Sequence, residues 1–196
     1  MAVNEGKKVL TVNLSLWTED FTDSVAKLIE FQKTALSTNA FYFDRGVWLN
    51  GFESAVSPSA PIEPSNMFML VFYSLEYLAS NELSESIRDA KPEDMLAELA
   101  AILSLVFAKN QDYGSSALQV PLLLPWLDPR CALLVRLSDK IQRLRTLFNA
   151  EKSAVDESIL DTLRDVVGYV FLLYAVLRTE ENTSQEEDAT DESGTV

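Results

Sequence analysis

The sequence contains no histidine and only one cysteine, Cys131, among its 196 residues. Without histidine there is no Ser-His-Asp triad, no Cys-His dyad, no His-ligated zinc and no imidazole general base. A single cysteine cannot form an intrachain disulfide, which suits a reducing compartment. Any catalysis by this chain would therefore rely on carboxylates, amines, hydroxyls or a bound metal.

Long apolar runs and glycine-rich stretches are also missing. No run approaches the roughly 18 apolar residues that identify a membrane-spanning helix. The start of the chain, MAVNEGKKVL, lacks the apolar core of a signal peptide. The six glycines are too scattered for a phosphate-binding loop. These absences predict a cytoplasmic protein that makes no contact with a membrane.

Basic residues are scarce. Sixteen lysines and arginines face 30 aspartates and glutamates, so the net charge is -14. Half of this charge lies after Arg178, where residues 179–196 contain no basic residue. Such a segment is expected to be a disordered acidic tail, either inert and solvated or able to mimic DNA. The rest of the chain is still acidic, which argues against direct nucleic-acid binding.

Hydrophobic residues make up 47% of the chain, enough for a core. Residues 8–17 alternate loosely, as a short strand does, and residues 41–49 have the pattern of a hairpin. Elsewhere apolar residues recur at helical spacing. The predicted helices span residues 18–37, 65–79, 81–90, 92–109, 131–149 and 155–178. The sequence thus predicts a mainly α fold with a small irregular or β-containing N-terminal segment.

An acidic stripe marks the last predicted helix. Glu157, Asp161 and Asp165 recur every four residues and, at about 100° per residue, fall within roughly 80° of one another. Stacked carboxylates repel one another unless a cation lies among them. Asp165 is flanked by Val166 and Val167, where an unpaired charge is costly. Because Mg²⁺ prefers hard oxygen ligands, the stripe predicts a magnesium site.

The preceding helix carries a basic stripe. Arg136, Lys140 and Arg143 are spaced i, i+4 and i+7 and so share one face. These cations could pair with the acidic stripe in interhelical salt bridges, which is a structural role. They could instead grip the phosphates of a substrate whose metal is held by the acids. The charge pattern leaves both explanations open.

A third cluster ends the helix predicted over 92–109. Lys109 could reach a phosphate, Asp112 a metal or a sugar hydroxyl, and Tyr113 could stack on a base. The alternative is an ordinary C-terminal lysine followed by an Asx-type turn before Gly114.

Three segments, taken in order, resemble the nucleotide-modification-associated domain 1 family of phages and bacteria. They are KNQDYG at 109–114, VRLSDKIQRL at 135–144 and DESILDTLRDVVGY at 156–169. That family is similar to the all-α NTP pyrophosphatases, the MazG and dimeric dUTPase group. The resemblance covers residues 92–178 and implies a MazG-like helical domain at 91–178. It leaves residues 1–90 as an N-terminal segment of unassigned role.

The resemblance implies a helical bundle, a homodimer or homotetramer, that hydrolyses nucleoside triphosphates to monophosphate and pyrophosphate with Mg²⁺. If a phage encodes the chain, its place would be the host cytoplasm. Two acidic motifs hold the metal in that group. In the second, Asp165 falls on the aspartate and Asp161 lies one residue from the expected glutamate. In the first, this chain has Asp139 with Lys140 and Arg143, which favours phosphate binding over metal binding.

Three hypotheses follow. In the first, the chain is a magnesium-dependent nucleotide pyrophosphohydrolase, whose catalytic and metal-binding acids are Glu157, Asp161 and Asp165, with Asp112 as a further metal ligand. Its substrate-binding residues would be Lys109, Asp112, Tyr113, Arg136, Lys140 and Arg143. In the second, the chain holds a modified or signalling nucleotide without hydrolysing it. In the third, it is a helical protein-interaction module.

Overall fold

The computed structural model describes residues 11–38, 64–80, 90–149 and 159–193. These residues form five α-helices and one short 3-10 helix, with no strand among them, which confirms the mainly α fold. The elements are α1 (Leu14–Thr38), α3 (Pro64–Ala79), α4 (Pro92–Asp112), η2 (Ser116–Leu118), α5 (Pro129–Asn149) and α6 (Ile159–Ser193).

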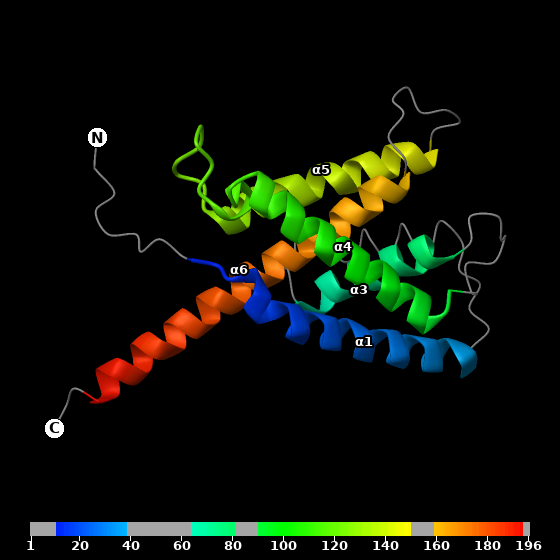
Figure 1. Cartoon of the computed structure of the whole chain (residues 1–196), viewed down its shortest axis with the longest axis horizontal. Coiled ribbons are helices and arrows are strands. Elements are labelled where there is room, and N and C mark those ends of the chain that lie inside the picture. Colours follow the sequence, from blue (N-terminus) through cyan, green and yellow to red (C-terminus); the bar gives the residue numbers. More distant parts are fainter. Residues whose placement is uncertain (1–10, 39–63, 81–89, 150–158, 194–196) are drawn as a thin grey trace.

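Helix α6 is the centre of the bundle. It contacts α1, α3, α4 and α5, and it crosses the whole molecule in Figure 1, where its C-terminal turns extend past the other helices. The reason lies in its sequence: from Val166 to Val176 nearly every side chain is buried, so this part of the helix is surrounded on all sides. The helices α1, α4 and α5 bury one face each, whereas every described side chain of α3 is at least partly buried.

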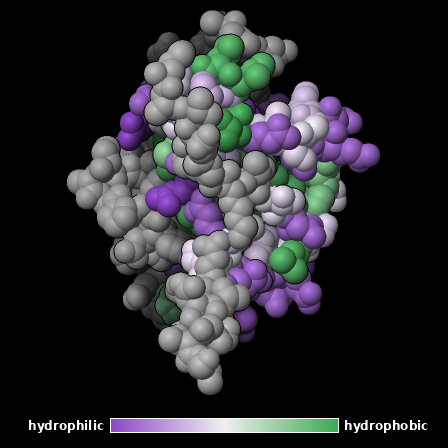
Figure 2. All heavy atoms as spheres, turned by 90° about the vertical axis from the view of Figure 1, so that its left-hand side faces the viewer, coloured by the Kyte–Doolittle hydropathy of each residue, from purple (hydrophilic) through white to green (hydrophobic). Residues whose placement is uncertain are grey.

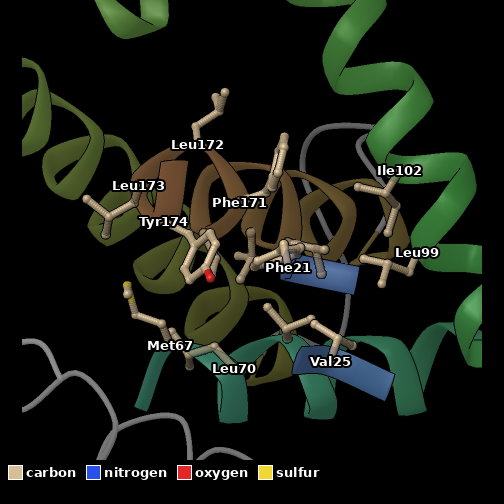
Figure 3. Packing of buried hydrophobic residues seen from close by; sticks show 14 of the residues in the cluster. Phe21, Val25, Met67, Leu70, Leu99, Ile102, Phe171, Leu172, Leu173 and Tyr174 are labelled. Carbon is tan, nitrogen blue, oxygen red and sulfur yellow. The ribbon is translucent and has the colours of Figure 1, made fainter. Parts of the chain in front are cut away.

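The core is continuous across the described helices. Phe21 of α1 lies against Phe171 and Tyr174 of α6, with ring centroids 5.1 and 5.3 Å apart, and Figure 3 shows these rings beside Val25, Met67 and Leu70. Leu99 and Ile102 of α4 belong to the same cluster. Residues on both sides of the boundary predicted at residue 90 therefore pack in one core.

The start of α1 corrects the strand predicted over residues 8–17. Residues 14–17 are helical, and α1 begins at Leu14 instead of Thr18. Leu14, Trp17 and Phe21 share one helical face and are buried, which a strand would not allow. The side chain of Asn13 accepts a hydrogen bond from the Ser15 amide at 3.2 Å and so caps this end.

The end of α6 corrects the disordered tail predicted over residues 179–196. The helix continues to Ser193, just before Gly194, the first glycine after Gly168. Thr179 is fixed against α1, because its hydroxyl accepts a hydrogen bond from the indole N–H of Trp17 at 3.0 Å. Arg178 pairs with Glu181 at 2.8 Å, one turn further along. Local pairs thus extend a helix that the packed core has already started.

The other predicted helices agree with the structure where it describes them. The predictions of 65–79, 92–109 and 131–149 correspond to α3, α4 and α5, each within three residues at either end. The hairpin predicted at 41–49 and residues 81–89 of the helix predicted at 81–90 lie outside the described residues. Ala90 is described and is not helical. Among the described helices, none combines the length and apolar character that crossing a bilayer requires.

Candidate functional site

A cavity of about 280 Å³ opens between α4, α5, α6 and the short η2 helix. One part of its wall is apolar and is built from Ile102, Leu105, Val106 and Leu172. Another part carries the charged side chains of Lys109, Arg136, Arg164 and Asp165. A cavity with an apolar wall and a few converging charged groups is the usual form of a small-molecule site.

The close approach of α4 and α6 at this wall depends on Gly168. A Cβ atom at this position would lie 2.9 Å from Cγ2 of Val106, which is closer than real Cβ contacts. Both residues line the cavity. The glycine therefore sets the spacing of the two helices that carry Lys109 and Asp165.

The loop that follows α4 closes one side of the cavity. Gly114 and Ser115 both have positive φ, at 58° and 59°, so the chain reverses sharply after the C-cap residue Tyr113. Asn110 holds this turn: its carbonyl accepts the Ser115 amide at 2.8 Å, and its side-chain amide donates to the Ser115 hydroxyl at 3.1 Å. The helix end predicted before Gly114 is confirmed.

Asp165 lies between two lysines from two other helices. Its Oδ1 is 3.2 Å from Nζ of Lys109 in α4, and its Oδ2 is 2.7 Å from Nζ of Lys140 in α5. The carboxylate is 24% exposed, so these pairs are partly shielded from water. Interhelical salt bridging, one of the two explanations open for the charged stripes, is thus realised at Asp165.

Arg136 differs from the other cations of the cavity. It lies one turn before Lys140 on α5, so the two side chains share a face, and it lines the cavity. Among the described residues, no ion pair or hydrogen bond engages its guanidinium. Arg136 is therefore a cation at the wall of the cavity that no carboxylate of the described chain neutralises.

Arg164 lines the cavity but is held by acids. Its Nε lies 2.7 Å from Oε1 of Glu98, and its Nη1 lies 3.5 Å from Oδ1 of Asp161. The hydrogen bond to Glu98 raises the pKa of the Arg164 guanidinium, although burial lowers it. The charge of Arg164 is thus fixed and largely neutralised by its own neighbours.

Two tyrosines complete the cavity. Tyr113, at the C-cap of α4, is 69% exposed, and Tyr169 of α6 is half-buried. Both rings line the cavity together with the cations. Aromatic rings provide flat faces on which a nucleobase can stack.

The structure brings together part of the predicted site. Of the predicted residues, Lys109, Tyr113, Arg136 and Asp165 line the cavity, and Lys140 reaches it through Asp165. The side chains of Asp112, Arg143 and Asp161 are not part of the lining, and Glu157 lies outside the described residues.

Arg164 and Tyr169 line the cavity but were not predicted as site residues. Both stand in the 156–169 segment that carries the family resemblance, and Arg164 directly precedes Asp165. Their place in this segment, close to Asp165, is the sequence signal that could have identified them as site residues. The partner of Arg164, Glu98, is 66 residues away in the chain, so no local pattern could indicate the pair.

The donors predicted for magnesium are not gathered by the described residues. Both oxygens of Asp165 contact ammonium groups, and Asp161 is 61% exposed and pairs with Arg164. Within the described part of the chain, no group of three or more His, Cys, Asp or Glu side chains is placed to hold a metal ion. The described acids of α6 therefore do not form a magnesium site of three carboxylates.

A match to a protein family falls on the same segment. The model of the family described as nucleotide modification associated domain 1 matches residues 109–177, about a third of the chain. This stretch runs from Lys109 at the end of α4 to the middle of α6 and includes every charged residue that lines the cavity. Neither the curated proteins nor the solved structures gave a match.

Proposed function

We propose that this protein binds a nucleotide in the cavity between α4, α5 and α6. The observation that carries the proposal is Arg136, whose guanidinium lines the cavity and has no ion-pair partner among the described residues. An exposed cation at the wall of a cavity, without a carboxylate partner among the described residues, attracts an anionic ligand. The planar guanidinium fork matches the oxygens of a phosphate particularly well.

The surroundings of Arg136 suit the rest of a nucleotide. The rings of Tyr113 and Tyr169 would face a base, and the apolar wall would cover it. The match to the nucleotide-modification-associated domain supports a nucleotide over other anions. In this proposal the chain holds a nucleotide, modified or signalling, in bacterial or phage nucleotide metabolism.

Isothermal titration calorimetry with the common ribo- and deoxyribonucleotides tests the proposal. We expect at least one nucleotide to bind, and Arg136→Ala to weaken its binding by about tenfold to a hundredfold, the loss of one charge-assisted contact. Arg130→Ala is the matched control, because Arg130 is an exposed arginine at the start of the same helix and does not line the cavity. Failure of every nucleotide to bind, or equal binding by both variants, would contradict the proposal.

A second candidate function is hydrolysis of a nucleoside triphosphate with Mg²⁺. Asp161 and Asp165 lie one turn apart on α6, with Glu157 one turn earlier in the sequence, and the motif order resembles that of the MazG group. Because the described acids do not form a metal site, this candidate rests on the motif order alone. Release of pyrophosphate or phosphate from a nucleotide in Mg²⁺, abolished by Asp165→Asn with the fold intact, would favour it. Recovery of every nucleotide intact would exclude it.

A further inference from the structure

Among the described residues, the charges at the cavity include four cations and three carboxylates. They are the charged lining residues and the acids and lysine that pair with them. Arg164 is neutralised by Glu98 with help from Asp161, and Asp165 is shared by two lysines. Arg136 alone among these cations has no carboxylate partner in the described part of the chain.

The two lysines that share Asp165 are not equivalent. Lys140 is 24% exposed and lies 2.7 Å from the carboxylate, whereas Lys109 is 49% exposed and lies 3.2 Å away. A longer contact and a wetter ammonium group make the Lys109 pair the weaker one. Lys109 can therefore turn toward a ligand while Lys140 continues to neutralise Asp165.

The site can thus offer an anion two positive charges, those of Arg136 and Lys109. A phosphate monoester carries about -1.5 to -2 charges at pH 7, which these two groups balance. Each further phosphate adds about one more negative charge, and that charge would lie near the carboxylates of Asp161, Asp165 and Glu98. Among the described residues, no group of three or more acids is placed to hold a metal ion that would offset this charge.

We infer that the ligand of this site is a nucleoside monophosphate and that the site discriminates against the triphosphate. The inference rests on the proposed function and adds to it the phosphorylation state of the ligand. Lys109 is a specificity-determining residue: without ligand it pairs with Asp165, and with ligand it pairs with the phosphate instead. Asp165 is a positioning residue, since it holds Lys140 and, without ligand, Lys109.

The test is calorimetry on the full chain with the mono-, di- and triphosphate of one nucleoside, the one that binds best in the nucleotide panel, in EDTA and then in Mg²⁺. In EDTA we expect the monophosphate to bind tightest, with the triphosphate weaker by about tenfold or more because its extra charge is not balanced. In Mg²⁺ the difference should narrow, because the ion bound to the triphosphate offsets part of its charge. Triphosphate binding as tight as that of the monophosphate in EDTA overturns the inference and leaves the proposed nucleotide site standing. If no phosphorylated form binds, both fail.

A pair of lysine variants tests the role of Lys109. Lys109→Gln should weaken binding of the monophosphate by about tenfold, the loss of one charged contact, and should leave binding of the unphosphorylated nucleoside unchanged. Lys91→Gln is the control, because Lys91 is the N-cap of the same helix, at the end opposite to the cavity. An equal loss for nucleoside and monophosphate, or no loss for either, overturns the assignment of Lys109.

Discussion

At Gly168 two helices pack so closely that one added carbon atom would collide. Gly168→Ala places a Cβ 2.9 Å from Cγ2 of Val106. Crowding of this kind typically costs about 1–3 kcal/mol, which exceeds the gain of roughly 1 kcal/mol in helix propensity from glycine to alanine. We therefore expect Gly168→Ala to lower the free energy of unfolding by about 1 kcal/mol, as measured by urea denaturation.

The effect of Gly168→Ala on the free energy of unfolding should change sign when Val106 is shortened. In a Val106→Ala background the clash is gone, so Gly168→Ala should be neutral or stabilising by up to roughly 1 kcal/mol. Equal destabilisation in both backgrounds would show that the Val106 contact is not the cause. The double-mutant cycle thus separates packing from helix propensity.

Glu76 is a buried acid that depends on one partner. It is 2% exposed, and its Oε1 lies 2.8 Å from Nζ of Lys33 in α1. Burial raises the pKa of Glu76, while Lys33 lowers it. Lys33→Met would leave the carboxylate unpaired, so we expect the free energy of unfolding to fall by roughly 3 kcal/mol at pH 7, as measured by urea denaturation.

The loss of stability caused by Lys33→Met should be smaller near pH 4 than at pH 7. Because the pKa of Glu76 is higher in the folded state than in the unfolded state, protonation in acid favours the folded state and removes the unpaired charge. Adding Glu76→Gln should recover much of the stability at pH 7. A loss of the same size at pH 7 and pH 4 would mean that Lys33 contributes by packing and not by its charge.

Among the helices, sequence periodicity predicted most of the fold because most helices bury one face. It worked for α4 and α5, whose apolar residues recur at helical spacing, while α3 was predicted as a compact apolar segment. It failed at the ends of α1 and α6. The pattern around Trp17 is typical of a strand, whereas in the structure Trp17 is helical and buried against α6. The residues after Arg178 have the composition of a disordered tail, but the hydrogen bond from Trp17 to Thr179 holds them against a helix that is distant in the sequence.

The sequence predicts which charged residues belong to the candidate site, but not which of them form ion pairs with one another. Arg136 and Asp165 are predicted from their helical spacing and Lys109 from its place at the end of a helix, and all three line the cavity. Whether Asp165 faces a metal or a lysine depends on how α4, α5 and α6 cross, which no local pattern contains. The pair of Arg164 with Glu98 joins α6 to α4 for the same reason.

Tyr174 links α6 to α1 through a hydrogen bond. Its hydroxyl donates a hydrogen bond to Asp20, and burial, followed by this bond, raises the pKa of Tyr174 from 10.0 to about 12. A raised folded-state pKa means that the stabilisation is complete below about pH 10 and is lost as the pH rises toward 12. We expect Tyr174→Phe to cost roughly 1 kcal/mol at pH 8.

Denaturation of the native chain and of Tyr174→Phe at pH 8 and at about pH 11.5, just below the folded-state pKa, measures this effect. The difference in the free energy of unfolding between the two proteins should narrow at the higher pH, because only the native chain has a hydroxyl at position 174 that can ionise. A constant difference across this range would mean that the hydroxyl is not a proton donor to Asp20 in the folded state.

At the scale of the whole molecule, the most exposed of the large apolar side chains in the described part of the chain gather in one loop between η2 and α5. Leu122 is 93% exposed, Leu123 85% and Trp126 75%. Two tight turns hold this loop, through bonds from the amides of Leu124 and Leu127 to the carbonyls of Pro121 and Leu124. Figure 2 looks onto the end of the molecule where the loop lies and shows apolar atoms at the top of that face.

A contiguous exposed apolar surface of this kind promotes association. A homodimer or homotetramer is a prediction made from the sequence, and we expect this loop to contribute to its interface. The double variant Leu122→Ser with Leu123→Ser should shift sedimentation velocity profiles toward the monomer. It should leave the melting temperature of the monomer nearly unchanged, since exposed side chains contribute within about 0.5 kcal/mol.

Leu16→Ser provides the matched control, because Leu16 is 62% exposed on α1, in a different helix from those that flank the loop. It should leave the association state unchanged. If the native chain is monomeric at every concentration, the predicted oligomer is wrong. If the chain associates but the loop variant associates equally well, the interface lies elsewhere. Association that weakens only in the loop variant would mean that the cavity, whose wall includes η2 just before this loop, adjoins the interface between subunits.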